Sequence, residues 1–400
     1  MNILLCHNYY QYRGGEDISF EDEARMLESR GHTVHRYTVH NDQIGTLNGW
    51  DVTRRSLWSE QVFDELRKLL QARRYDVLHC TNTFPLISPA AYDAARAEGV
   101  PIVQSLRNYR LLCPTSFLMR QGRVCEECVG RATAWPGILH GCYRDSRIAT
   151  AVVATISLLH RRRRTTQRDA TYYYTPTEFA RHKLIEGGVP SDRIAVKNNF
   201  VEPDPGVGFG TGGYAVCVGR LSPEKGIDTL LQAWSKLTKQ NDQLVLKIVG
   251  GGPMAAQVRA AVDSCPQIQW LGELSHSETL SIIGEAAMLV MPSVWYETFG
   301  RTMIEAFACG TPVVASRLGA MAEVVLDGAT GLHFTAGDAD DLAEKILSLS
   351  SDRERLAQMR LEARREYLRK YTVDTNYRQL ISIYERAIKA GCHPRPANDA

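Results

Sequence analysis

The strongest constraint on the fold is that short apolar runs alternate with amphipathic helical patterns in both halves of the chain. This alternation is typical of a parallel sheet flanked by helices. In the first half, a helix over Glu16–Arg30, stopped by Gly31, separates the first two runs. The strands predicted in this half are Asn2–Cys6, His32–Tyr37, Asp76–Cys80, Pro101–Leu106 and Ala170–Thr175.

The pattern is interrupted at Glu202–Gly213, where Pro and Gly are too dense for a regular element. It restarts with strands at Tyr214–Gly219, Leu244–Gly250, Ile268–Gly272, Ala286–Ser293 and Thr311–Ser316, and with a helix over Gly226–Leu237. We therefore predict an α/β protein with two Rossmann-like doubly wound domains, residues 1–204 and 205–375, facing across a cleft. Residues 376–400 are expected to form a closing helix and a disordered tail.

Composition narrows the class of protein. The chain has 400 residues, 44% of them hydrophobic and 23% charged, which is typical of a globular protein. A net charge of +2 gives no overall field that would favour nucleic acid. The N-terminus lacks a signal-peptide pattern and no apolar run approaches 18 residues, so we expect a cytoplasmic protein without a transmembrane helix.

Charged residues follow several predicted strands, where ligands of parallel sheets bind. Arg220 and Lys225 lie in the glycine-containing loop after Tyr214–Gly219 and suit an anion such as a diphosphate; the alternative is an ordinary solvated loop. Glu297 and Glu305 lie around a Phe-Gly turn after Ala286–Ser293. Their carboxylates suit sugar hydroxyls, although a cap or helix-dipole compensation would also explain each one.

A Gly-Gly pair follows the first predicted strand. Gly14 and Gly15 precede the first helix, and without Cβ atoms they let backbone amides approach a phosphate closely. A lone Gly-Gly is a weak signal, so its value depends on the loop of Arg220 and Lys225 facing it across the cleft.

These motifs together resemble the retaining glycosyltransferases of family 4, which have the GT-B fold. The resemblance is carried by "GRLSPEKG", "VGGGP", the two glutamates with Phe-Gly between them, and "CGTPVVAS", and it runs from Tyr214 to Phe334. In the first half, "GGED", "HCTNTFPLISP" and "LRNYRLLCP" are similar to bacterial members that build polysaccharides.

The resemblance implies a hexosyltransferase that uses a nucleotide-sugar donor, retains the configuration of the sugar and needs no catalytic metal. Arg220 and Lys225 would bind the diphosphate, Glu305 the ribose, and Glu297 the hydroxyls of the donor sugar, with backbone contacts from Phe299 and Gly300. The acceptor would be a saccharide or a polyprenyl-linked sugar, in cell-surface polysaccharide or glycolipid biosynthesis.

One position departs from the family pattern. Many members have a histidine in a His-Asn-Tyr-Arg context where this chain has Arg107. Arginine cannot accept a proton, so a general base is excluded there. Arg107 is then either a donor-binding group or half of a structural salt bridge, and we expect His79 to be a packed or cleft-lining residue.

Four cysteines, Cys113, Cys125, Cys128 and Cys142, cluster in an insertion over residues 113–142 of the first domain. Four thiolates can close a tetrahedral structural zinc site, and His140 could replace one of them. The alternatives are a reduced loop, an iron–sulfur cluster or a reversible disulfide. Since the resemblance places the acceptor on this domain, the insertion would shape acceptor choice.

An apolar stretch after Arg147 ends in the basic run Arg161–Arg164. As a helix it is too short to cross a bilayer. We consider two roles for residues 147–164: a helix on the inner face of the plasma membrane, with the arginines on anionic lipid, and a core helix with a solvated basic end.

Two other functions use the same features. A GT-B-like epimerase or phosphorylase would share the cleft, but the chain shows no context for a lysine-bound cofactor. A zinc-containing nucleic-acid-binding protein would use the cysteines and the arginine run, but the near-neutral charge and the lack of interleaved aromatic residues oppose it.

Overall fold

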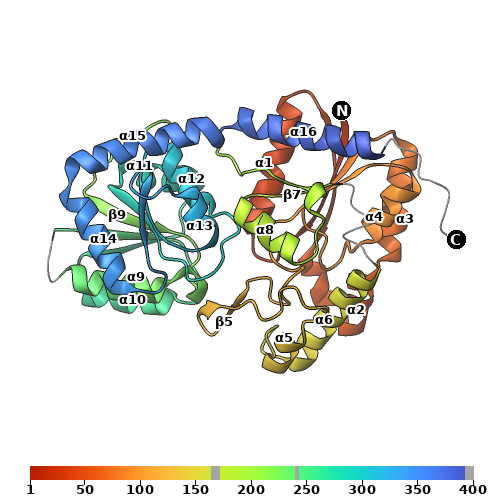
Figure 1. The fold of residues 1–400 in the computed structure, drawn as a ribbon, viewed down its shortest axis with the longest axis horizontal. Coiled ribbons are helices and arrows are strands. Elements are labelled where there is room, and N and C mark those ends of the chain that lie inside the picture. The colour runs from red at the N-terminus through yellow and green to blue at the C-terminus, as the bar shows by residue number, and fades with distance from the viewer. Residues whose placement is uncertain (164–171, 239–242, 392–400) are drawn as a thin grey trace. The chain divides into compact units, whose positions relative to one another are not determined.

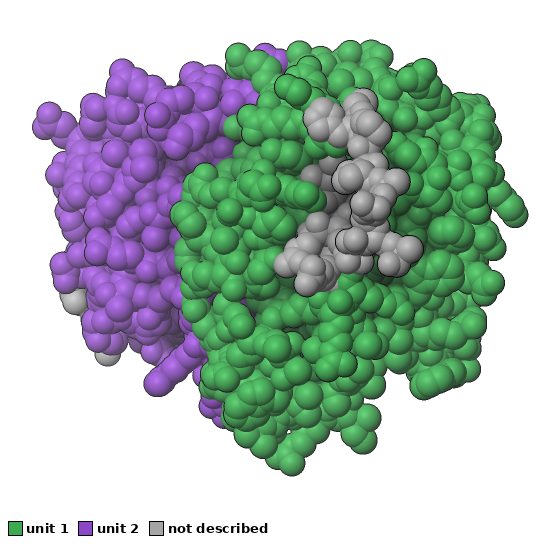
Figure 2. Space-filling view, turned by 45° about the vertical axis from the view of Figure 1, so that its right-hand side comes forward, with its two compact units in different colours: residues 1–117, 126–197, 377–400 green, residues 118–125, 198–376 purple. Residues whose placement is uncertain are grey.

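The computed structural model describes residues 1–163, 172–238 and 243–391. Arg164 of the basic run lies outside these residues, and so does the expected disordered tail apart from Gly391. The chain forms two compact units (Figure 2): unit 1 comprises residues 1–117, 126–197 and 377–400, and unit 2 comprises residues 118–125 and 198–376. The predicted boundary at 204/205 lies close to this division, and the last helix is shared between the units.

Unit 1 contains a six-stranded parallel sheet in the order β2-β1-β3-β4-β7-β8. Its strands are β1 (Asn2–Tyr9), β2 (Thr33–His40), β3 (Val77–Cys80), β4 (Ile102–Ser105), β7 (Tyr172–Thr175) and β8 (Ile194–Val196). Its helices are α1 (Gly15–Ser29), α2 (Gly49–Leu57), α3 (Glu60–Ala72), α4 (Ala90–Ala97), α5 (Trp135–His140), α6 (Arg147–Arg162) and α8 (Glu178–Glu186). Short 3₁₀ turns occupy Asn41–Thr46 and Ser191–Arg193.

Unit 2 contains a second six-stranded parallel sheet in the order β11-β10-β9-β12-β13-β14. Its strands are β9 (Tyr214–Val218), β10 (Val245–Val249), β11 (Ile268–Gly272), β12 (Met288–Met291), β13 (Val313–Ser316) and β14 (Gly331–Phe334). Its helices are α9 (Ile227–Leu237), α10 (Ala255–Ser264), α11 (His276–Glu285), α12 (Arg301–Ala308), α13 (Gly319–Val324), α14 (Ala339–Ser351) and α15 (Arg353–Lys370), and α16 (Val373–Gly391) starts here and continues into unit 1. A 3₁₀ turn covers Pro223–Lys225, and β5 (Met119–Arg120) and β6 (Arg123–Val124) form a separate hairpin.

Both faces of the unit 2 sheet are covered, which explains why its central strands β9, β12 and β13 are nearly continuous apolar runs. Alternate residues of β9 point to opposite faces: Ala215 and Cys217 join a cluster with α9, α10 and α14, whereas Val216 joins a cluster with α11, α12, α13 and α15. The two layers of helices are visible on either side of this sheet in Figure 1. The predicted doubly wound α/β fold is therefore confirmed.

Several helix ends follow from the local sequence. Ser146 starts α6 by accepting a hydrogen bond from the Ala149 amide, and Ser275 and Glu278 form a reciprocal capping box at α11. Within the described residues, no helix is long and apolar enough to reach across a bilayer.

Candidate active site

The candidate site of unit 2 lies where the strand order of its sheet reverses. β9 is hydrogen-bonded to β10 on one side and to β12 on the other, so the connections leaving β9 and β12 diverge at this point. Such switch points are where open parallel sheets bind ligands. The loop after β9 carries Arg220 and Lys225, and the loop after β12 carries Glu297.

A glycine allows the loop after β9 to approach the loop after β12 closely. Gly226 has φ of 70°, and a Cβ at this position would lie 1.9 Å from the carbonyl oxygen of Pro292. Only glycine combines this conformation with so close a backbone approach. The Val294 amide also donates to the Glu224 carbonyl at 3.0 Å, so the spacing of the loops is fixed by main-chain atoms.

Glu297 is buried and its Oε1 accepts three hydrogen bonds. The Lys225 ammonium donates at 2.5 Å, and the Ser293 hydroxyl and Trp295 indole each donate at 2.9 Å. The Lys225 nitrogen also lies 5.5 Å from the centre of the Trp295 ring. The resemblance assigned Lys225 and Glu297 to different parts of a donor, whereas the structure joins them directly.

Arg220 differs from Lys225. Its side chain is exposed and, among the described residues, it makes no hydrogen bond or ion pair. The backbone of Gly250–Gly252 packs directly against its loop. A Cβ on Gly250 would lie 2.0 Å from the Gly219 carbonyl oxygen. The Leu221 amide donates to the Gly251 carbonyl at 2.8 Å. The fixed loop therefore presents a guanidinium that is available to an anion.

Glu305 is buried in the second turn of α12. Its Oε1 lies 3.8 Å from Arg301 Nε and 4.0 Å from His276 Nδ1. Gly300, with φ of 82°, precedes the helix, and the Phe299 side chain is buried in the core. Only the backbone of Phe299 is left to contact a ligand.

Gly14 and Gly15 begin α1 in unit 1, but neither has a positive φ and neither meets a close steric neighbour that would require glycine. The Gly14 amide donates to Asp17 Oδ2 at 2.8 Å, and Asp17 Oδ1 lies 2.8 Å from His7 Nε2. Hence a carboxylate of the protein already uses the amide that was expected to hold a phosphate.

Arg107 takes part in a buried polar network of unit 1. Glu23 Oε1 accepts from Arg107 at 2.7 Å and from Lys197, while Glu23 Oε2 accepts from the Tyr174 hydroxyl at 2.9 Å. Of the two roles considered for Arg107, the structure contains the salt bridge. His79, as expected, is packed: its Nε2 lies 3.0 Å from the Tyr174 hydroxyl and its Nδ1 2.8 Å from that of Tyr384.

The network perturbs its titratable groups strongly. Burial opposes the charge of Glu23, but Lys197 and Arg107 outweigh it and lower the pKa of Glu23 to about 2. Burial lowers the pKa of Lys197 to about 8, against the attraction of Glu23. Burial also lowers the pKa of His79 to about 4, so this imidazole is neutral at pH 7.

The structure gives no support to the zinc site predicted at Cys113, Cys125, Cys128 and Cys142. Within the described residues, no three Cys, His, Asp or Glu side chains are placed to hold a metal ion. The Cys113 sulfur instead lies 3.1 Å from the Thr115 hydroxyl, and Cys128 is buried. Spacing alone was the basis of the prediction, and it does not fix how the thiols converge.

In a comparison with known proteins, each half of the chain matches a family of glycosyltransferase domains. The family model "Glycosyl transferases group 1" matches residues 207–366, and "Glycosyl transferase 4-like domain" matches residues 14–199. The chain belongs to the family-4 glycosyltransferases with the GT-B fold. The first of these matches contains the described neighbourhood of Arg220, Lys225, Glu297 and Glu305.

Two curated glycosyltransferases illustrate the relationship. An uncharacterized glycosyltransferase of Methanocaldococcus jannaschii is 26% identical over 94% of this chain and 95% of its own length. Phosphatidyl-myo-inositol mannosyltransferase of Mycobacterium leprae is 31% identical over 42% of this chain and 45% of its own length. The chain spans about half the length of several other curated relatives that it matches.

A solved structure shares the fold over nearly the whole chain. HepE of Anabaena, in complex with UDP-glucose, superposes with a TM-score of 0.67 at 17% identity, over 96% of this chain and 99% of its own.

The sequence of this glycosyltransferase did not reveal the partners of its glutamates. Ser293 and Trp295 precede Glu297 by four and two positions in the motif, so their proximity could have been noticed. His276 comes from α11 and reaches Glu305 only through the fold.

Proposed function

We propose that this glycosyltransferase transfers a hexose from a nucleotide sugar to a saccharide or lipid-linked acceptor, with retention of configuration, in cell-surface polysaccharide or glycolipid biosynthesis. The observation that carries the proposal is the arrangement at the switch point of unit 2. There the loop after β9 carries Arg220, which is exposed and has no partner among the described residues, and Lys225, which pairs with Glu297 of the loop after β12. Backbone contacts fix the spacing of these two loops.

In this proposal Arg220 and Lys225 bind the diphosphate and stabilise it as it leaves. Charge-assisted hydrogen bonds are worth about 1.5–3 kcal/mol each, so two that strengthen in the transition state supply roughly 3–6 kcal/mol. This corresponds to a rate factor of roughly 10² to 10⁴. The positive charge that a catalytic metal would provide thus comes from side chains.

The two glutamates bind the two ends of the donor. Glu305 accepts from the ribose hydroxyls and Glu297 from the hydroxyls of the sugar, with the backbone of Phe299 and Gly300 between them. Support comes from the burial of both carboxylates and from the three donors that fix Glu297, since a preorganised acceptor loses little entropy when the sugar binds.

The first test is thermal stabilisation of the purified protein by UDP, GDP, ADP and their sugars. A ligand that binds only the folded state adds RT ln(1 + [L]/Kd), which is about 2.7 kcal/mol at 100 Kd. We expect one nucleotide to raise Tm, and the rise to be lost in Lys225→Ala and kept in Lys236→Ala, whose lysine pairs with Asp340 elsewhere on unit 2. Absence of a shift with every nucleotide would contradict the proposal. Retention is read separately from the anomeric configuration of the product by NMR.

We also propose that unit 1 contacts an anionic membrane surface through the α5–α6 region. Trp135, Leu139 and Ile148 are 52%, 53% and 81% exposed, and Arg162 and Arg163 are exposed at the end of α6. Apolar side chains beside cations suit the interface of an anionic bilayer. In liposome flotation, Ile148→Ser with Arg162→Glu and Arg163→Glu should reduce recovery; recovery equal to wild type would refute this contact.

A further inference from the structure

The indole of Trp295 contacts both members of the ion pair in unit 2. Its Nε1 donates to Glu297 Oε1 at 2.9 Å, and the centre of its ring lies 5.5 Å from Lys225 Nζ. Lys225 Nζ donates to the same Oε1 atom at 2.5 Å. One side chain therefore contacts the cation with its ring and the anion with its N–H group.

The carboxylate is the buried member of this pair, and the ammonium is the more exposed one. Glu297 is 5% exposed, whereas the side chain of Lys225 is 29% exposed. A second neutral donor, the hydroxyl of the buried Ser293, also binds Oε1 at 2.9 Å. Water has little access to this oxygen, so donors of the protein take its place as partners of the negative charge.

These neutral donors affect how much of the Lys225 charge remains for a ligand. A hydrogen bond to an ionised oxygen is stronger than one between neutral groups, because the donor dipole offsets part of the charge. When the indole and the hydroxyl offset part of the Glu297 charge, the carboxylate attracts the ammonium less strongly. Without the indole N–H, Glu297 would attract Lys225 more strongly and would compete better with an anionic ligand for it.

The ring of Trp295 limits where the ammonium can lie. The face of an indole attracts a cation within about 6 Å of its centre, and the observed 5.5 Å is inside this range. A lysine side chain is flexible, so a ligand that immobilises it loses conformational entropy. An ammonium that is already held by a ring and a carboxylate loses less of this entropy when a diphosphate binds.

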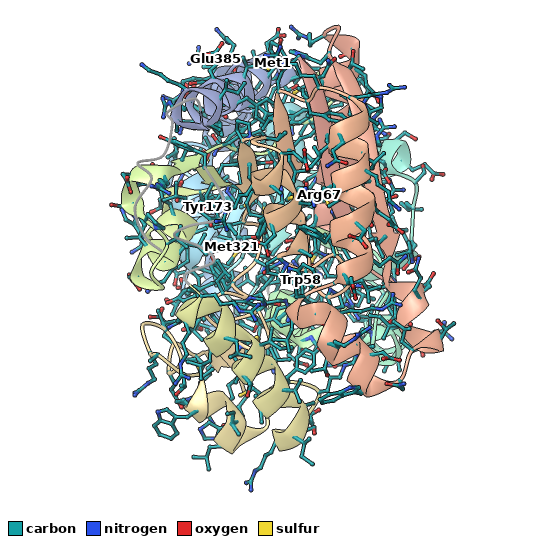
Figure 3. The ribbon with its side chains drawn as sticks, turned by 90° about the vertical axis from the view of Figure 1, so that its right-hand side faces the viewer. Met1, Trp58, Arg67, Tyr173, Met321 and Glu385 are labelled. Carbon is teal, nitrogen blue, oxygen red and sulfur yellow. The ribbon has the colours of Figure 1, made fainter. Side chains whose placement is uncertain are left out.

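Trp58, labelled in Figure 3, makes the same kind of hydrogen bond in unit 1. Its Nε1 donates to Asp93 Oδ2 at 2.9 Å, and it is partly exposed, as Trp295 is. Asp93 also accepts from a cation, Arg96, at 3.5 Å. The two tryptophans thus share an indole-to-carboxylate bond beside a cation, but only the carboxylate at Trp295 holds the lysine proposed to bind the diphosphate.

We propose that Trp295 is a positioning residue for the diphosphate: it fixes the position of Lys225 and offsets the charge of Glu297. The inference rests on the proposed function, in which Lys225 binds the diphosphate of the donor. It adds to that function a residue whose effect on ligand affinity depends on Glu297, and this dependence can be measured.

The test is a double-mutant cycle on nucleoside diphosphate binding, measured by calorimetry on the full chain with whichever of UDP, GDP and ADP raises Tm. Trp295→Phe keeps an aromatic face beside Lys225 and removes the N–H donor, so Kd should rise about tenfold. In a Glu297→Gln background the same substitution should raise Kd less than about twofold, because the charge that the indole offsets is absent. Trp58→Phe, the matched control, should change Kd less than about twofold in either background.

A second variant repeats the test at a smaller side chain. Ser293→Ala removes the other neutral donor and should raise Kd about threefold, and only in the presence of Glu297. A Tm without ligand near that of the wild type shows that each variant is folded.

The inference is overturned if Trp295→Phe leaves Kd unchanged. It is also overturned if Trp295→Phe raises Kd equally in both backgrounds, as expected of a tryptophan that binds the ligand itself or only stabilises its loop. Lys225→Ala distinguishes the inference from the proposed function. An unchanged Kd in that variant contradicts the proposed function, whereas a raised Kd there, with no effect of Trp295→Phe, contradicts the inference alone.

Discussion

Each unit places a carboxylate against cations near the carboxyl ends of parallel strands, but the two arrangements differ in access to water. In unit 1, Glu23, Arg107 and Lys197 are all buried and bond one another. In unit 2, Lys225 is partly exposed beside buried Glu297, and Arg220 is exposed and unpaired among the described residues. A fully buried group of mutually paired charges stabilises the fold. A partly exposed group at the edge of a sheet, in which a cation has no counter-ion, can still bind an anionic ligand.

The largest expected effect comes from opening the closed network. Glu23→Gln removes the buried carboxylate that Arg107 and Lys197 both contact and should cost about 3–5 kcal/mol of unfolding free energy, measured by urea denaturation. Glu21→Gln, on the same helix but paired with the exposed Arg13, is the matched control and should cost less than about 1 kcal/mol. Equal losses of unfolding free energy in the two variants would show that the buried network stabilises the fold no more than an exposed ion pair does.

The next effect concerns the open arrangement of unit 2. Lys225→Ala should lower kcat by roughly 10- to 150-fold, because one charge-assisted hydrogen bond worth about 1.5–3 kcal/mol is lost in the transition state. Steady-state kinetics with the donor identified by thermal stabilisation would measure it, with Lys236→Ala as control. An unchanged kcat would remove Lys225 from the reaction.

Lowering the pH from 7 to 5 should reduce the free energy of unfolding by about 2 kcal/mol, through the buried network of unit 1. The pKa of His79 falls from its ordinary 6.5 to about 4 in the folded protein, so below pH 6.5 the unfolded chain binds the proton first and stability is lost as pH falls. Glu23, with its pKa lowered to about 2, adds a further loss below its ordinary value of 4.5. Urea denaturation at both pH values should show a smaller loss in His79→Gln than in wild type or in the exposed variant His276→Gln.

The smallest effect on stability is expected at Arg220. Because this side chain has no partner among the described residues, Arg220→Ala should change the unfolding free energy by less than about 0.5 kcal/mol. The same variant should weaken nucleotide binding about tenfold or more, as measured by calorimetry. If Arg220→Ala lowered the unfolding free energy but left nucleotide affinity unchanged, Arg220 would be a structural residue and not a ligand-binding one.

The sequence was sufficient for those parts of the fold and site that depend on local pattern. The strand-helix alternation located most strands of both sheets, but β8, with three residues, and β14 were missed. Arg220, Lys225 and Glu297 follow strands in sequence, so the switch point brings their loops together. The Arg107–Glu23 pair joins residues 84 positions apart, which no local pattern reveals. The cysteine spacing, in turn, says nothing of how the intervening loop folds.

The shared helix α16 affects the order in which the protein can be completed during synthesis. Tyr384, which bonds His79, is separated from it by 305 residues, and residues 377–391 belong to unit 1 although they follow all of unit 2. A ribosome therefore releases every residue of unit 2 before unit 1 has its last helix. The sheet that is translated first is the one whose buried network is completed last. A chain stopped before α16 would leave His79 Nδ1 without the hydroxyl of Tyr384.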